Sequence, residues 1–307
     1  MLTRIFETSK PLNFLWVSLL LFLGFSLDWF YTEAHGFQLL ELLEYVSILG
    51  LLIFSVLLVD FIVRKNELSK KNTFVVLLYG CFMALMPLSK LGVEGIAAHV
   101  LVLLALRRVI SLRSMKSVKK KIFDASLWIT IATLLWFAAG GMIAVVFLGV
   151  LLFDRLDYRN WIIPLFGIAA VLILYFTGHW VIFDQTPAMD FLKDWQLDFS
   201  EWMALKTAWI PFYFFILSAV LLPVYWFGFR KIMLVRKRQP LLIVLTVLVS
   251  WLVAFFVQPI QTSSLVLLMF PLGVMACGLV EKNNKRPITE LVLWLFLLLP
   301  FAARTVI

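Results

Sequence analysis

Residues 43–65 read LEYVSILGLLIFSVLLVDFIVRK, a long apolar run followed by two basic residues. An α-helix rises about 1.5 Å per residue, so the apolar part, 43–63, is long enough to cross about 30 Å of hydrocarbon. The pair Arg64 and Lys65 is typical of the cytoplasmic end of a transmembrane helix. The stretch therefore predicts a membrane span that ends at the cytoplasmic surface.

The rest of the chain has the same apolar character. Of the 307 residues, 63% are hydrophobic and 15% are charged, and the mean hydropathy is +1.00. A soluble domain carries about 25% charged residues and does not contain this much apolar surface. Apolar runs such as Leu241–Val257 and Leu291–Phe301 are separated only by short basic or polar clusters. We therefore predict an all-α, polytopic transmembrane bundle that forms a single integral membrane domain over 1–307.

The same length criterion predicts eleven spans along the chain. They lie near 13–31, 43–63, 73–89, 91–110, 125–138, 140–153, 161–183, 208–229, 240–257, 263–280 and 288–305. The stretch 125–153 is too long for one helix and short for two, and two successive glycines, Gly140 and Gly141, predict a break at its middle. This short hairpin either crosses the membrane twice or re-enters it from the cytoplasmic face.

The basic residues predict the orientation of the spans, because cytoplasmic loops are enriched in Lys and Arg. With a reversal in 125–153, all but four of the 27 Lys and Arg residues fall in cytoplasmic segments. The exceptions are Lys90, Lys193, Lys206 and Arg304. A single crossing would place the basic clusters on either side of 125–153 on opposite faces. We expect a cytoplasmic N-terminus, an outer C-terminus and a multi-pass location in a bacterial inner (cytoplasmic) membrane.

This charge distribution also accounts for the net charge of +9. The loop 107–121 alone contains seven Lys and Arg residues and no acid. A basic inner face attracts anionic lipid headgroups, by about 1 kcal/mol per basic residue near the surface. We expect anionic lipids, and not nucleic acid, as partners of this face. The alternative is that these charges only fix the orientation of the chain.

Two outer segments have the pattern of helices that lie in the membrane interface. In 37–45, apolar residues face one way, while Glu41 and Glu44 face another. In 188–205, a stripe of Leu, Trp, Phe and Met at helical spacing lies opposite several acids and one lysine. Both patterns are typical of amphipathic interfacial helices. Such helices either anchor loops at the headgroup level or frame an outward-facing cleft.

Two acids near the outer end of the first span are the candidate catalytic residues. Asp28 lies in the last turn of that span, and Glu33 follows in the first outer loop. Ionisable residues in spans are costly and usually face a bundle interior or a water-filled cavity. A carboxylate at the outer mouth of the bundle is placed to act as a general base or to bind a divalent metal. The alternative is that an acid at a span end simply reaches water.

The candidate substrate-binding residues share this outer position. They are Lys90, Glu94, His99, His179, Asp184 and Arg304. Lys90 and Glu94 are spaced i, i+4, so they can pair on one helix face. Arg304 is either an anion contact or a snorkelling residue. A histidine at the depth of His99 is more often a hydrogen-bonded interior residue than a ligand.

Several short motifs are similar to those of a group of membrane proteins. The motifs are Ser9-Lys10-Pro11-Leu12-Asn13, Lys71-Asn72-Thr73 before a span that ends at Pro87, Lys121-Ile122-Phe123-Asp124-Ala125, and Phe270-Pro271-Leu272. Together they resemble an uncharacterised family of Bacteroidota inner-membrane proteins of about this length. Its members are sometimes labelled β-carotene monooxygenases, which implies an iron held by four histidines. This chain contains 3 histidines, and that activity is therefore excluded.

The layout also resembles polyprenyl-linked sugar transferases of the GT-C type. Those proteins have a cytoplasmic N-terminus, an acid in the first outer loop and short interfacial helices. Asp28, Glu33 and the segment 37–45 match these positions, although the chain is short for the class and lacks its usual soluble domain. The resemblance implies a polyprenyl-phosphate-sugar-dependent, glycosyltransferase-like activity on a lipid-linked sugar or glycan at the outer leaflet. Likeness of layout does not by itself establish function.

Two other functions fit the sequence. One is a non-catalytic subunit of a membrane complex for envelope biogenesis or secretion, with other membrane subunits as its partners. The other is a transporter, although transporters often carry charges near the membrane midplane beside broken helices. The sequence contains no GxSxG, HExxH, Walker A or DxD motif.

Overall fold

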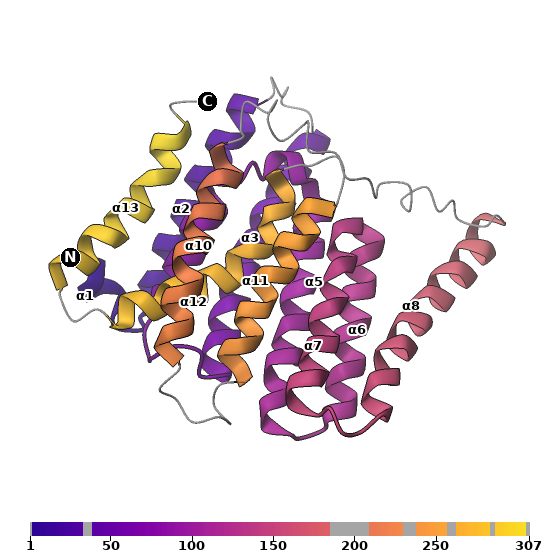
Figure 1. Cartoon of the computed structure of the whole chain (residues 1–307). Coiled ribbons are helices and arrows are strands. Elements are labelled where there is room, and N and C mark those ends of the chain that lie inside the picture. The colour runs from indigo at the N-terminus through magenta and orange to yellow at the C-terminus, as the bar shows by residue number, and fades with distance from the viewer. Residues whose placement is uncertain are drawn as a thin grey trace.

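The computed structural model describes residues 2–32, 39–184, 209–229, 238–256, 262–282 and 286–304 (Figure 1). Within these ranges the chain is helical throughout and contains no strand. Seven of the described helices are long and apolar enough to cross a membrane, and three shorter apolar helices accompany them. The prediction of an all-α chain is confirmed, and the seven helices are what a multi-pass membrane protein requires.

The described helices follow the order of the predicted spans. They are α1 Leu2–Phe6, α2 Pro11–Thr32, α3 Leu39–Lys65, α4 Phe74–Ala84, η1 Ser89–Leu91, α5 Gly92–Ile110, η2 Ser111–Ser114, α6 Val118–Leu135, η3 Phe137–Met142, α7 Ile143–Phe153, α8 Arg159–Phe183, α10 Trp209–Phe229, α11 Arg238–Phe256, η6 Thr262–Leu268, α12 Met269–Lys282 and α13 Arg286–Arg304. Each of the eleven predicted spans overlaps a described helix, which does not by itself show that the helix crosses a membrane. However, α4, α7 and the apolar part of α13 are shorter than a full crossing, and α6 has three lysines in its first turn.

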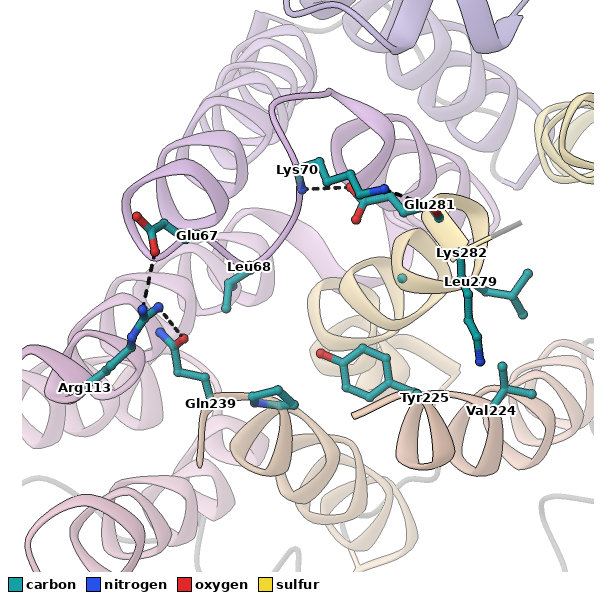
Figure 2. A pocket seen from close by; sticks show the side chains of 13 residues that line it. Glu67, Leu68, Lys70, Arg113, Val224, Tyr225, Gln239, Leu279, Glu281 and Lys282 are labelled. Carbon is teal, nitrogen blue, oxygen red and sulfur yellow. Dashed lines mark hydrogen bonds and ion pairs between the residues drawn. The ribbon is translucent and has the colours of Figure 1, made fainter. Parts of the chain in front are cut away.

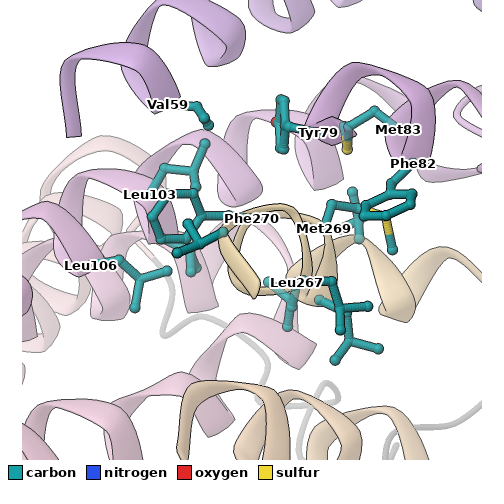
Figure 3. Close-up of a cluster of buried hydrophobic side chains, with 14 of the residues drawn as sticks. Val59, Tyr79, Phe82, Met83, Leu103, Leu106, Leu267, Met269 and Phe270 are labelled. Carbon is teal, nitrogen blue, oxygen red and sulfur yellow. The ribbon is translucent and has the colours of Figure 1, made fainter. Parts of the chain in front are cut away.

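Helices α4 and α12 lie at the centre of the bundle. All 11 residues of α4 are buried. Of the apolar stretch of Ser264–Lys282, 83% is buried, compared with 17% for α8. Figure 3 shows Tyr79 and Phe82 of α4 beside Phe270 of α12 in one cluster of buried apolar side chains. Helices α4 and α12 therefore form the centre of the core, while α8 lies at its edge.

Small residues let α2 and α4 approach closely. A Cβ added at Gly80 would clash with the side chain of Val17, and a Cβ added at Gly24 would lie 3.0 Å from the Cβ of Ala84. Membrane helices commonly associate through such small residues. Helix α4 ends at Ala84, short of the predicted end at 89, because Pro87 disfavours helical backbone at the residue before it.

The reversal within 125–153 differs in position from the prediction. Helix α6 ends at Leu135, and Trp136 is extended (φ −149°, ψ 109°) before η3 and α7. The break therefore comes before the predicted glycine pair. The φ angle of Gly141 is not positive, so this residue makes no turn that requires glycine. A Cβ there would clash with Val253 of α11, which shows that Gly141 serves close helix packing.

The described part of the predicted interfacial helix 37–45 is the beginning of α3. That helix runs without a break for 27 residues, about 40 Å at 1.5 Å per residue, which exceeds the thickness of the hydrocarbon core. Its interior contains no proline, and the single Gly50 is tolerated within the helix. Residues 37 and 38, and the second predicted interfacial helix at 188–205, lie outside the described residues.

Candidate functional site

Asp28 links α2 to the segment that begins α5. Its side chain is buried, and the backbone N–H of Ser89 donates a hydrogen bond to its Oδ2 (2.8 Å). Ser89 begins η1, which leads into α5 through Gly92, a residue with a φ of 65°. The carboxylate therefore satisfies a backbone donor at a helix junction. This contact explains its burial, and the catalytic role expected for Asp28 stays a prediction.

Lys90 and Glu94 lie at the same end of the bundle as Asp28. Lys90 belongs to η1 and Glu94 to the first turn of α5. Both are exposed, and these two described residues form no ion pair with each other. Glu44 of α3 is also near, because its Oε1 lies 3.9 Å from where a Cβ on Gly92 would be. Acids from three helices thus share this end.

His99 is a buried interior residue with hydrogen-bonded neighbours. Its Nε2 lies 3.0 Å from the hydroxyl oxygen of Tyr79, which donates to Ser55 Oγ (2.9 Å). The Ser55 hydroxyl in turn donates to the carbonyl of Leu52 (2.6 Å). Because the Tyr79 proton is directed to Ser55, the hydrogen-bond network assigns the ring proton of His99 to Nε2. His99 thus joins α5 to α4 and α3.

Of the remaining predicted site residues, the two that the structure describes, His179 and Asp184, are not brought to this group. His179 and Asp184 lie at the far end of α8, which packs against α6 and α7 at the opposite edge of the bundle from α2 (Figure 1). Arg304 ends α13, and its side chain is outside the described part of the chain, as is Glu33. Among the described residues, no group of three His, Cys, Asp or Glu side chains is arranged to hold a metal ion.

A cavity lined by described residues lies at the other end of the bundle. It has a volume of about 600 Å³, and Figure 2 shows the side chains around it. Its lining residues come from the α3–α4 connection, η2, α10, α11 and α12: Glu67, Leu68, Lys70, Arg113, Val224, Tyr225, Gly228, Gln239, Pro240, Gly278, Leu279, Glu281 and Lys282. We call this cavity the cleft. The two ends of the bundle are the two ends of α5. Its first turn contains Glu94, near Asp28, and its last turn contains Arg107, on the side of the cleft.

Arg113 organises one wall of the cleft. Its guanidinium donates to Gln239 Oε1 (2.9 Å) and lies 3.4 Å from Glu67 Oε2 (Figure 2). Gln239 is buried, and its amide donates to the backbone carbonyl of Asn66 (3.3 Å). These contacts join η2 to the end of α3 and the start of α11. The wall therefore presents a fixed cation beside an amide group.

Glu281 organises the opposite wall. Its Oε1 accepts hydrogen bonds from the backbone N–H of Lys70 (2.9 Å) and from the side-chain amide of Asn72. The thiol of Cys277 lies 3.6 Å from the same oxygen. This carboxylate therefore holds the α3–α4 connection against α12. Between the two walls, the cleft is lined by apolar side chains, including Val224 and Leu279.

In the sequence, Arg113 and Lys70 indicate only the orientation of the chain, and no pattern distinguishes Gln239 from other polar residues at a span end. A partial signal for this site is present in the sequence. Glu67 and Glu281 are two of the eight acids that fall in otherwise basic inner segments. Acids in such positions indicate pairing between loops, although they do not reveal which loops meet.

Comparison with known proteins returns no relative. The sequence matches no family model and no curated protein, and no solved structure matches the fold. The resemblances to the Bacteroidota family and to the GT-C layout therefore stay predictions, as do the subunit and transporter alternatives.

Proposed function

We propose that the protein is an eleven-span membrane protein with a cytoplasmic N-terminus, and that it binds a lipid-type amphiphile with an anionic headgroup in the cleft. The observation that carries this proposal is the two-sided lining of the cleft. The apolar part belongs to α10 and α12, and the charged part contains three cations, Lys70, Arg113 and Lys282, and two acids, Glu67 and Glu281, which leaves one positive charge in excess. An amphiphile with an anionic headgroup has the same two parts.

The size and position of the cleft support this ligand class. A volume of about 600 Å³ falls within the range of about 300–1,000 Å³ that is usual for small-molecule pockets. Val224 lines the cleft and is also 37% exposed, so the apolar wall continues onto the outer surface of α10. An acyl or prenyl chain can therefore pass from the cleft along this helix into the surrounding lipid.

The proposed ligand class includes the lipid-linked sugars expected from the sequence, but the proposed face is different. The sequence placed the ligand at the outer end, beside Asp28. Neither of the two cavities described here is lined by any of the predicted site residues. The basic residues beside the cleft belong to segments that the charge distribution predicts to be cytoplasmic. We therefore place the headgroup at the cytoplasmic surface.

Filling the cleft tests the proposal. A Cβ at Gly228 would meet no atom within 4 Å, so Gly228→Leu adds a bulky side chain to the cleft lining from a position that is open at the Cβ. Gly178→Leu is a matched control, because Gly178 is equally open and lies on α8, away from the cleft. Both changes also replace a helical glycine with a better helix former.

The measurement is the amount of anionic lipid that remains with protein purified in mild detergent, determined by mass spectrometry of the extract. We expect Gly228→Leu to retain severalfold less of one lipid class than the wild type and Gly178→Leu. Lipid that merely surrounds the bundle would be retained equally by all three proteins. Equal retention would therefore contradict the proposal.

A further inference from the structure

A second, smaller cavity of about 330 Å³ lies beside the cleft. The two cavities share only the wall formed by Glu67, Arg113 and Gln239. The remaining lining of the smaller cavity comes from the ends of α3 and α5, from η2 and from Lys121 of α6. We call it the cationic pocket.

Five basic side chains from four segments of the chain line the cationic pocket. They are Lys65, Arg107, Arg108, Arg113 and Lys121. Two of them have carboxylate partners: Arg108 pairs with Asp124 (2.9 Å) and Arg113 with Glu67 (3.4 Å). The other three have no carboxylate partner among the residues that the structure describes. Like charges gathered in this way repel one another unless an anion lies between them.

The cations of the pocket are held in place by specific contacts. The ring of Phe61 lies under two of them: its centroid is 4.6 Å from the guanidinium carbon of Arg107 and 5.2 Å from the amine of Lys65. Such cation–π contacts stabilise a positive charge without neutralising it. The pocket is therefore partly organised before any anion binds.

Lys121 is held by two hydrogen bonds. Its ammonium donates to the backbone carbonyl of Ser111 (2.6 Å) and to Ser114 Oγ (2.7 Å). An ammonium has three N–H donors, so one remains for a ligand. Burial, followed by the charges of Arg108 and Lys65, lowers the pKa of the Lys121 amine from its ordinary value. A bound anion would offset that repulsion and favour the charged form.

Orientation of the chain in the membrane does not account for this convergence. Positive charge on the cytoplasmic side requires basic residues in the loop, but it does not require them to meet in a hollow. The loop 107–121 contains both cations that line the pocket and cations that do not. Lys116 and Lys120 are exposed and do not line the pocket, and Lys119 pairs with Asp157 (3.6 Å). Only some of the loop's cations are directed into the pocket.

We propose that the cationic pocket is a binding site for a phosphoryl group. The planar fork of an arginine matches the oxygens of a phosphate and can bind it through two hydrogen bonds. The Lys65 and Lys121 ammonium groups supply further charge on the same cavity. The phosphoryl group belongs either to a lipid headgroup or to a soluble phosphate. This inference does not require a ligand in the cleft.

Charge-matched variants test the proposal. Lys65→Gln with Lys121→Gln removes two positive charges from the pocket, and Lys116→Gln with Lys120→Gln removes two from the exposed part of the loop. Each protein is reconstituted in phosphatidylcholine nanodiscs, with or without phosphatidic acid, and its thermal unfolding midpoint is measured. A second arm adds inorganic phosphate to the phosphatidylcholine sample at constant ionic strength. The first arm reports a lipid headgroup and the second a soluble phosphate.

We expect phosphatidic acid, inorganic phosphate or both to raise the unfolding midpoint of the wild type and of the exposed-loop variant. For the pocket variant we expect the apparent affinity for phosphatidic acid or phosphate to fall by about tenfold or more, because charge-assisted hydrogen bonds to the phosphoryl group are lost. If the pocket variant unfolds too early in phosphatidylcholine alone, Arg107→Gln provides the same comparison. An equal response of pocket and exposed-loop variants would overturn the proposal, as would no response of the wild type in either arm.

The two proposals fail separately. Gly228→Leu fills the cleft and leaves the cations of the pocket in place, because Gly228 does not line the cationic pocket. Normal stabilisation of Gly228→Leu by phosphatidic acid or phosphate therefore supports the phosphoryl site even if the cleft holds no lipid.

Discussion

Some of the polar side chains inside the bundle form hydrogen bonds to neighbouring helices. His99, Tyr79 and Ser55 form a hydrogen-bonded series across α5, α4 and α3. Asp28 accepts a hydrogen bond from the backbone of Ser89. A buried polar group without a partner costs about 1–3 kcal/mol. These contacts therefore account for polar residues at places where the sequence alone also allowed a catalytic or ligand-binding role.

The contact of Asp28 leads to a prediction for two substitutions. Asp28→Ala removes the acceptor for the Ser89 N–H and should reduce stability by about 1–3 kcal/mol. Asp28→Asn retains an amide oxygen that can accept the same bond, so its loss should be smaller. Thermal unfolding in detergent measures both. An alanine variant as stable as the wild type would show that this contact does not hold α2 against the start of α5.

At the scale of the helices, the sequence predicts where a helix lies along the chain better than it predicts the residue at which the helix ends or the helices that pack beside it. Apolar runs in the sequence locate the described helices, and seven of these helices have the length and composition that a membrane crossing requires. The ends depend on local backbone, so α4 stops before Pro87 and α6 stops at Trp136. The cleft was not predicted because its lining comes from segments as distant in sequence as Glu67 and Lys282. Periodicity within one helix does not say which other helices lie beside it.

The contact between α2 and α4 gives a prediction at this scale. Gly80→Ala would place a Cβ against Val17, and overpacking of this kind costs about 1–3 kcal/mol. Gly50→Ala in α3 is the control, because a Cβ there meets no atom within 4 Å. We expect the control to be neutral or stabilised by up to about 1 kcal/mol through its better helix propensity. Unfolding midpoints that change equally in both variants would contradict close packing at Gly80.

Considered as a whole, the molecule has different chemistry at its two ends. Asp28, Glu44 and Glu94 lie at one end, where α2 finishes and α3 and α5 begin. The cleft and the cationic pocket lie at the other end, where Lys65, Arg107 and Lys121 are gathered. A bilayer core of about 30 Å separates two such surfaces, while the field of surface charges decays over about 8 Å at physiological salt. The charges at one end therefore have little electrostatic effect on the charges at the other end.

The orientation of these ends is the last prediction, and it follows from the basic residues. All but four of the 27 Lys and Arg residues fall in segments assigned to the cytoplasm by an eleven-span path, and such segments are enriched in basic residues. A reporter that is active only in the cytoplasm should therefore be active when fused after Lys121. A reporter that is active only on the outer side should be active when fused after Ile307. A fusion after Lys206 tests the segment 185–208, which should also be outside. A cytoplasmic C-terminus would contradict the odd number of crossings, whereas an outer Lys121 would place both cavities on the wrong face for the headgroup we propose.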